Sequence, residues 1–175
     1  MKTLLPLLLL FSICLSSKAQ ERCLVEDEIV VYIFMLEDCP ITQYYVPTLK
    51  NLFHTYNPYQ VSFIGLFPNK YSKPIKIDSF QQDYQVPFPL KTDYFQKKVQ
   101  RFKASVTPEV VIYNKTYDEI WYQGRIDNRY SRVGRSKYTT TKYELADALE
   151  AIVRGEPILQ KKTEAIGCFI TTITK

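Results

Sequence analysis

Apolar residues recur along the chain with two different periods, which separate the expected strands from the expected helices. Residues 28–36 (EIVVYIFML) form a continuous apolar run, typical of a strand buried on both faces. Residues 41–56 carry apolar side chains at helical spacing, which predicts a helix with one buried face. The expected strands are 28–36, 60–67, 109–114 and 119–123, with an extended piece at 86–90. The expected helices are 40–56, 75–84, 94–102 and a last one from Thr140 or Thr141 to just before Gly155.

The order of these elements predicts the topology. A strand, a helix and a second strand imply a parallel pair joined by a crossover helix, whereas the turn at 114–118 implies an antiparallel hairpin. We therefore expect an α/β fold with a mixed central sheet and helices on both faces. Residues 125–139 are expected to form a long polar loop and 158–175 a C-terminal tail, so that 20–157 make up one domain.

The first nineteen residues have the composition of a secretion signal. Lys2 precedes the apolar run 4–15, and residues 17–19 (SKA) resemble the small-x-small site that signal peptidase cuts. The run is shorter than the roughly 20 residues that a membrane span needs. We expect residues 1–19 to be removed from an exported protein, periplasmic or secreted, with no membrane span after cleavage.

Charge and cysteine content narrow the function classes. The formal net charge of +5 is mild, and the basic residues within 125–142 come without a basic helix or Gly-rich motif, so no nucleic-acid partner is expected. Of the four cysteines, Cys14 falls in the expected signal, which leaves Cys23, Cys39 and Cys168. Export allows disulfides to persist, and an odd number leaves at least one thiol unpaired within the chain.

Cys39 has the surroundings that best suit thiol chemistry. It follows the first expected strand and precedes Pro40, which suits the first position of a helix. A helix N-terminus offers unpaired N–H groups and partial positive charge, and both favour the thiolate. Glu37 and Asp38 oppose this effect, so we expect the pKa of Cys39 to be lowered only moderately. The alternative is that Cys39 is a small buried hydrophobic residue.

Several segments, EDCPIT, VTPEVVIY, GRIDNRY and EAIGCFI, together resemble exported redoxin-domain proteins (AhpC/TSA-related) of the thioredoxin-like superfamily. The matching features are a strand leading into Cys39, Pro47 within the following helix, Thr107-Pro108 before a strand, and a hairpin with a terminal helix. The resemblance implies a three-layer thioredoxin-like fold with a cis peptide bond at Pro108. It also implies a thiol–disulfide oxidoreductase without cofactor or metal, acting on a protein or small-molecule disulfide or thiol.

The chain departs from the superfamily's dithiol motif, because Thr42 stands where the second cysteine is usual. The resemblance implies Cys39 as the nucleophile and Cys168 as the resolving thiol, with Cys23 as the second candidate. The residues expected to contact substrate are Pro40, Thr42, Thr107, Pro108 and Arg125. For Arg125, a salt-bridged turn is an equally good interpretation.

Two other functions remain open at this stage. Cys39 and Cys168 could bind Cu(I) as a pair of thiolates, or the chain could be a non-catalytic binding module that uses its sheet edge or Tyr-rich surface. His54, the only histidine, lies fifteen residues beyond Cys39. That is about 22 Å along a helix, which excludes a Cys-His pair within it. The sequence assigns no substrate, electron donor or oligomeric state.

Overall fold

The computed structural model describes residues 27–172. The expected signal at 1–19, with Cys14, and the candidate Cys23 lie outside the described residues. The elements in chain order are β1 (Ile29–Phe34), α1 (Pro40–Tyr56), η1 (Asn57–Tyr59), β2 (Ser62–Phe67), α2 (Pro74–Asp83), β3 (Leu90–Thr92), α3 (Lys97–Phe102), β4 (Val106–Thr107), β5 (Glu109–Asn114), β6 (Glu119–Gly124), β7 (Tyr130–Arg132), β8 (Arg135–Ser136), α4 (Glu144–Val153) and β9 (Cys168–Phe169).

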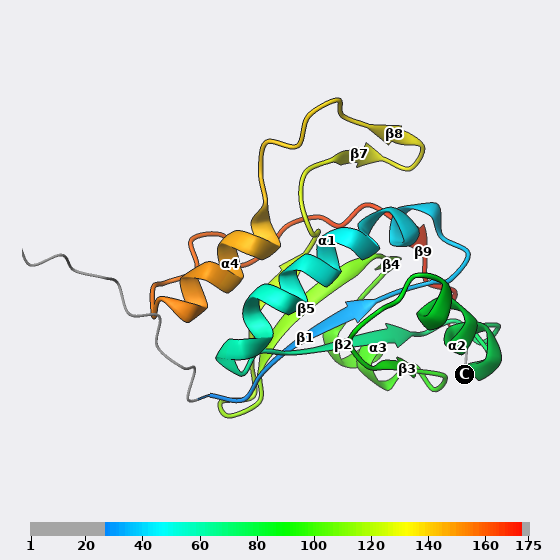
Figure 1. Cartoon of the computed structure of the whole chain (residues 1–175), viewed down its shortest axis with the longest axis horizontal. Coiled ribbons are helices and arrows are strands. Elements are labelled where there is room, and N and C mark those ends of the chain that lie inside the picture. The colour runs from blue at the N-terminus through cyan, green and yellow to red at the C-terminus, as the bar shows by residue number, and fades with distance from the viewer. Residues whose placement is uncertain (1–26, 173–175) are drawn as a thin grey trace, which may run out of the picture.

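A five-stranded mixed sheet forms the centre of the molecule, in the order β3-β2-β1-β5-β6 (Figure 1). β1, β2 and β3 run parallel to one another, because α1 and α2 carry the chain back between them. β5 is antiparallel to both β1 and β6, and β5–β6 is the hairpin expected at 114–118. The predicted α/β architecture with a mixed central sheet is confirmed.

The two faces of the sheet carry separate hydrophobic cores. All six residues of β1 are buried, and successive side chains point to opposite faces. Ile29, Val31 and Ile33 pack in the core that also contains buried residues of α1, α2 and α4. Val30, Tyr32 and Phe34 pack in the other core, which contains Val99 and Phe102 of α3. Burial on both faces explains why β1 reads as a continuous apolar run.

Two predicted helix starts are wrong by a few residues. The third main helix begins at Lys97 rather than 94, because the Asp93 carboxylate accepts the N–H groups of Lys98 and Val99, each at 3.0 Å, across an intervening turn. The last helix begins at Glu144 rather than Thr140 or Thr141.

Residues 125–139 were predicted to form a long polar loop, and this prediction is wrong in part, because β7 and β8 form a short antiparallel hairpin there. Asn128, before β7, is joined to Thr141, after β8. The Asn128 side-chain NH2 donates to the Thr141 hydroxyl at 2.8 Å, and its side-chain oxygen accepts the Thr141 N–H at 3.0 Å. Figure 1 shows the hairpin projecting beyond α1, away from the central sheet.

The C-terminal tail is packed against the domain along most of its described length. It first extends the sheet edge at β6, where the Thr163 N–H donates to the Gln123 carbonyl at 3.0 Å. It then forms β9, which pairs with β4 so that Cys168 lies opposite Thr107. Beyond β9, the Thr171 N–H donates to the Asn69 side chain at 3.0 Å. Within residues 27–172, no helix is long and apolar enough to cross a membrane.

Candidate functional site

Cys39 occupies the N-cap position of α1, as its sequence setting predicts. Its backbone is extended (φ −88°, ψ 115°), Pro40 follows in the first turn, and its carbonyl accepts the Gln43 N–H at 3.0 Å. The Cys39 thiol donates a hydrogen bond to the Thr107 carbonyl, with sulfur and oxygen 3.3 Å apart. The loop before β5 therefore lies within direct reach of the candidate nucleophile.

The C-terminal tail adds the second thiol to this place. The Thr107–Pro108 peptide bond is cis. The antiparallel register of β4 and β9 sets Cys168 opposite Thr107, and the Thr107 hydroxyl donates to the Cys168 carbonyl at 3.3 Å. Three segments that are distant in sequence, carrying Cys39, Thr107 and Cys168, thus meet at one end of α1.

Gly167 allows the tail to approach this closely. A Cβ atom at that position would lie 2.1 Å from the Thr107 carbonyl oxygen and 3.0 Å from the Pro108 nitrogen. Real side chains do not tolerate such distances to backbone atoms, so any other residue would push the tail away. Glycine is needed here because it has no Cβ.

Hydrogen bonds to the Cys39 sulfur favour its thiolate. Burial raises the pKa of Cys39, but the hydrogen bonds that its thiolate can accept from the Cys168 thiol, from the Thr42 N–H and hydroxyl, and from the Cys168 N–H outweigh burial. The pKa of Cys39 is therefore lower than that of an ordinary cysteine. The direction agrees with the prediction, although side chains contribute to it as well as the helix terminus.

The same contacts make Cys168 the protonated partner. Burial raises the pKa of Cys168, and its hydrogen bond to Cys39 and the negative charge at Cys39 raise it further, to about 12. The proton shared by the two sulfurs contributes to both shifts, since the sulfur that keeps it stabilises the negative charge on the other. Cys168 is therefore the hydrogen-bond donor of the pair, and the negative charge resides on Cys39.

The acidic residues before Cys39 face other partners. The Glu37 carboxylate accepts a hydrogen bond from the Ser72 hydroxyl at 2.6 Å. Asp38 is exposed and lies 3.6 Å from the ammonium group of Lys76. These contacts draw both carboxylates toward the segment that contains α2, so neither is among the main causes acting on the pKa of Cys39.

Thr42 stands at the position of the absent second cysteine and is fully buried. Its hydroxyl oxygen has no hydrogen-bond partner among the described residues while the Cys39 thiol donates to Thr107. Deprotonation of Cys39 supplies the acceptor that this hydroxyl lacks. The Thr42 hydroxyl therefore stabilises the thiolate without stabilising the thiol to the same degree.

Cys39 has no solvent-exposed surface. The sequence offered a reactive thiol and a buried hydrophobic residue as alternatives, and the structure combines features of both. Part of the cover is the tail, because Cys168 packs on the core cluster that contains Cys39 and hydrogen-bonds to its sulfur. Access of a partner to the Cys39 sulfur therefore requires that covering residues shift, and the tail is one of the covering segments.

Arg125 contacts a buried acidic residue of α4 and the C-terminal tail. The Arg125 guanidinium pairs with the buried carboxylate of Glu144. The backbone N–H of Arg125 donates to the Thr163 hydroxyl of the tail at 3.0 Å. Gly124 is equally close to the tail, since a Cβ there would lie 2.1 Å from the same hydroxyl oxygen. The pair with Glu144 matches the salt-bridged interpretation of Arg125.

A polar contact that the sequence analysis did not single out joins α1 to the loop after β6. The Tyr45 hydroxyl donates to the buried carboxylate of Asp127, which also accepts the Arg129 N–H at 2.8 Å. Tyr45 was expected only as an apolar contact on the inner face of the helix. Its hydroxyl group and the acid in GRIDNRY were the available signals, but nothing in the spacing links them.

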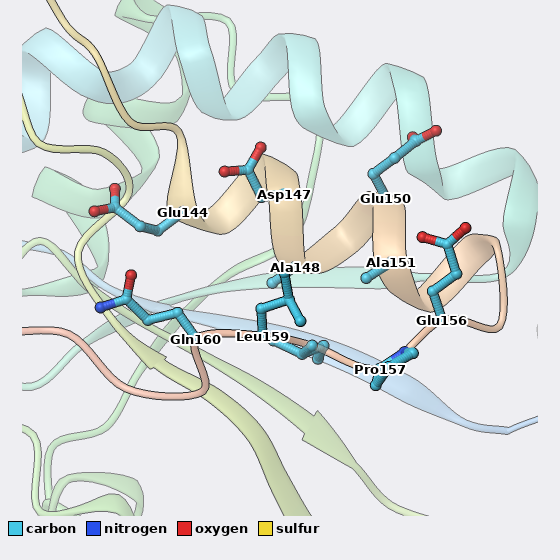
Figure 2. A pocket seen from close by; sticks show the side chains of 10 residues that line it. Glu144, Asp147, Ala148, Glu150, Ala151, Glu156, Pro157, Leu159 and Gln160 are labelled. Atoms are coloured by element: carbon cyan, nitrogen blue, oxygen red, sulfur yellow. The ribbon is translucent and has the colours of Figure 1, made fainter.

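A groove of about 510 Å³ lies between α4 and residues 156–160, and neither thiol lines it (Figure 2). The carboxylates that line it are those of Glu144, Asp147, Glu150 and Glu156. Across residues 27–172, no group of three or more His, Cys, Asp or Glu side chains is arranged to hold a metal ion. Among the described residues at the candidate site, the two thiols are the side chains that could ligate a metal ion as a pair.

Comparison with known proteins supports the fold through structure alone. No family model and no curated protein match the chain. An uncharacterized conserved protein from Geobacillus kaustophilus superposes with a TM-score of 0.76 at 24% identity, over 87% of this chain and 81% of that one.

Two more distant structures have names that refer to redox proteins or to the fold. One is a secreted Mycobacterium tuberculosis disulfide oxidoreductase homologous to E. coli DsbE, with a TM-score of 0.52 and 19% identity over 73% of this chain and 84% of that one. The other is a thioredoxin-like protein from Aeropyrum pernix, with a TM-score of 0.52 and 16% identity over 74% and 78%. The chain has the thioredoxin-like fold.

Proposed function

We propose that this thioredoxin-fold chain is an exported thiol–disulfide oxidoreductase in which Cys39 is the nucleophile and Cys168 the resolving thiol. One observation carries the proposal: the β4–β9 register sets Cys168 opposite Thr107, whose carbonyl accepts the Cys39 thiol. Two thiols with oppositely shifted pKa values at one helix start form the pair that exchange chemistry needs.

The first step is attack on the partner. The Cys39 thiolate attacks one sulfur of a substrate disulfide and forms a mixed disulfide with it. The substrate's own sulfur–sulfur bond breaks, and its other sulfur leaves as a thiolate that takes a proton from water. The lowered pKa of Cys39 keeps more of its sulfur in the attacking form near neutral pH.

The second step uses the change in charge at Cys39. In the mixed disulfide, Cys39 carries no negative charge, so two of the causes that raise the pKa of Cys168 disappear. Cys168 then loses its proton to water more readily and attacks the Cys39 sulfur. A Cys39–Cys168 disulfide forms, and the remaining substrate sulfur leaves and is protonated. The protein has lost two thiols, the substrate has gained two, and an external thiol reductant restores the dithiol form.

The expected export of the chain and one of the similar solved structures support this proposal. The M. tuberculosis protein is secreted and is a disulfide oxidoreductase, and this chain begins with a segment that resembles a secretion signal. An oxidising compartment supplies the disulfide partners that a cytosolic protein would rarely meet.

A single-turnover experiment tests the proposal. The reduced mature protein is mixed with 2-hydroxyethyl disulfide, a small neutral substrate, and quenched with an alkylating reagent. Non-reducing peptide mapping then identifies each bond. We expect a Cys39–Cys168 disulfide in the wild type, a mixed disulfide trapped on Cys39 in Cys168→Ser, and no reaction at Cys168 in Cys39→Ser. Full substrate reduction by Cys39→Ser, or a Cys23–Cys39 bond in place of the expected one, would overturn this assignment.

A further inference from the structure

The hairpin formed by β7 and β8 concentrates positive charge close to the candidate site. Residues 129–138 (RYSRVGRSKY), here called the basic arm, contain four basic residues and no acid. Arg132, Arg135 and Lys137 are exposed, as are the large side chains of Val133 and Tyr138. Among the described residues, β7 and β8 pair only with each other, so the arm presents its charges outside the central sheet.

The base of the basic arm is fixed to α1 in the second turn after Cys39. The ring of Tyr130 lies 5.5 Å from that of Tyr44 and 5.8 Å from that of Tyr45. The Arg129 guanidinium carbon lies 5.9 Å from the Tyr44 ring centre, within the range of a cation–π contact. The arm therefore holds a set position relative to the helix that carries the nucleophile.

A small cavity joins the base of the arm to the site itself. Tyr45, Tyr130, Pro108 and Ile166 line it together, so the arm meets the loop after Thr107 and the tail before Cys168. Burial is the main cause that raises the pKa of Tyr130, and the charge at Cys39 adds to it. A partner held on the arm would thus have its neighbouring segments close to both thiols.

We propose that the basic arm binds an acidic segment of disulfide-bearing substrate proteins and presents their disulfide to Cys39. This inference rests on the proposed function and names the substrate class. Charge complementarity selects acidic partners, since the exposed cations of the arm attract carboxylates. A polypeptide is the expected partner because it can place carboxylates on the arm and, at the same time, a disulfide at the thiols beside the arm.

The test compares two disulfide-bridged peptides that differ only in flanking Glu or Lys residues, with 2-hydroxyethyl disulfide as a neutral reference. At low salt we expect the acidic peptide to react with a kcat/KM about tenfold above that of the basic peptide, and the preference to disappear in about 0.5 M NaCl. The triple variant R132Q/R135Q/K137Q should lose most of this preference and keep the wild-type rate with the neutral disulfide.

A matched variant removes the same number of charges elsewhere. Lys70, Lys91 and Lys97 are exposed in the turn after β2, on β3 and at the start of α3, and within residues 27–172 none of them lines a cavity with a residue of the arm, so K70Q/K91Q/K97Q should keep the preference. The proposal is overturned if both triple variants behave alike. It is also overturned if labelled single-stranded DNA binds to the wild type but not to R132Q/R135Q/K137Q, while this variant keeps the wild-type preference for the acidic peptide. Failure to reduce any disulfide would instead refute the proposed function.

Discussion

Thr42 offers the sharpest test of the thiolate argument, because one hydroxyl group can be removed with little change of shape. Thr42→Val replaces the buried hydroxyl with a methyl group. A hydrogen bond to a charged group contributes about 1.5–3 kcal/mol, which corresponds to about tenfold or more in an equilibrium constant. We expect the ratio of thiolate to thiol at Cys39 to fall by about that factor at any given pH below its pKa.

The measurement is ultraviolet absorbance of the reduced protein at 240 nm against pH, which follows thiolate directly and needs no access to the buried sulfur. It is kept below pH 9, because the chain has 14 tyrosines and an ordinary tyrosine side chain, with a pKa of about 10, also absorbs at this wavelength once it is ionised. Thr42→Ser keeps the hydroxyl and should titrate close to the wild type. If Thr42→Val superimposes on the wild type, the hydroxyl does not stabilise the thiolate and the account of this site is wrong.

Thr42→Val should also change the free energy of unfolding of the reduced protein, in a direction that depends on pH. The pKa of Cys39 is lower in the folded than in the unfolded chain, so the unfolded chain binds more protons and stability rises between the folded pKa and about 8.5. This gain is lost as the pH falls through the folded pKa. Below it, Thr42 buries an unpaired hydroxyl, and Thr42→Val should stabilise the reduced protein. At pH 8.5 it should destabilise it, and urea unfolding at both pH values distinguishes this from a simple packing effect.

Three further predictions test the neighbouring contacts. Cys39→Ala should lower the pKa of Cys168 from about 12, because two of its causes come from Cys39; peptide-resolved alkylation against pH measures this, and an unchanged profile contradicts it. Gly167→Ala should displace the tail and speed alkylation of Cys39 severalfold, whereas an unaltered rate would mean that the tail is not the barrier. Tyr45→Phe leaves the buried Asp127 carboxylate short of a donor and should lower the free energy of unfolding by about 1–3 kcal/mol, so an unshifted urea midpoint would refute that contact's role.

The central sheet could be predicted because burial on two faces leaves a strong mark on sequence. β1 is fully buried and reads as an unbroken apolar run, β5 is buried with an apolar centre between Glu109 and Asn114, and the candidate nucleophile follows directly from local rules for helix starts. Cys39 and Pro40 needed no information from distant parts of the chain. The order of strands and helices then limited the topology to a mixed sheet.

The cover over the site could not be predicted, because it depends on contacts between distant segments with little local signal. β4 and β9 have two residues each and lie about sixty residues apart, so neither has a periodicity that reveals its partner. The hairpin of the basic arm was not predicted for a related reason. β7 and β8 are exposed, and an exposed two-stranded hairpin needs no alternation of apolar and polar residues. Gly134, with φ of +76°, was the only local sign of its turn.

The position of Cys168 connects access to the site with the oxidation state of the protein. In the dithiol form, the tail near Cys39 is held by the short β4–β9 pairing, by a hydrogen bond between the two sulfurs and by the fit of Gly167. These contacts can open and close without breaking a covalent bond, so a substrate can reach Cys39 when the tail lifts. A Cys39–Cys168 disulfide would fix the same segment in place over the nucleophile. The resolving step would therefore release the product and close the site together, which ties each opening for a new substrate to prior reduction.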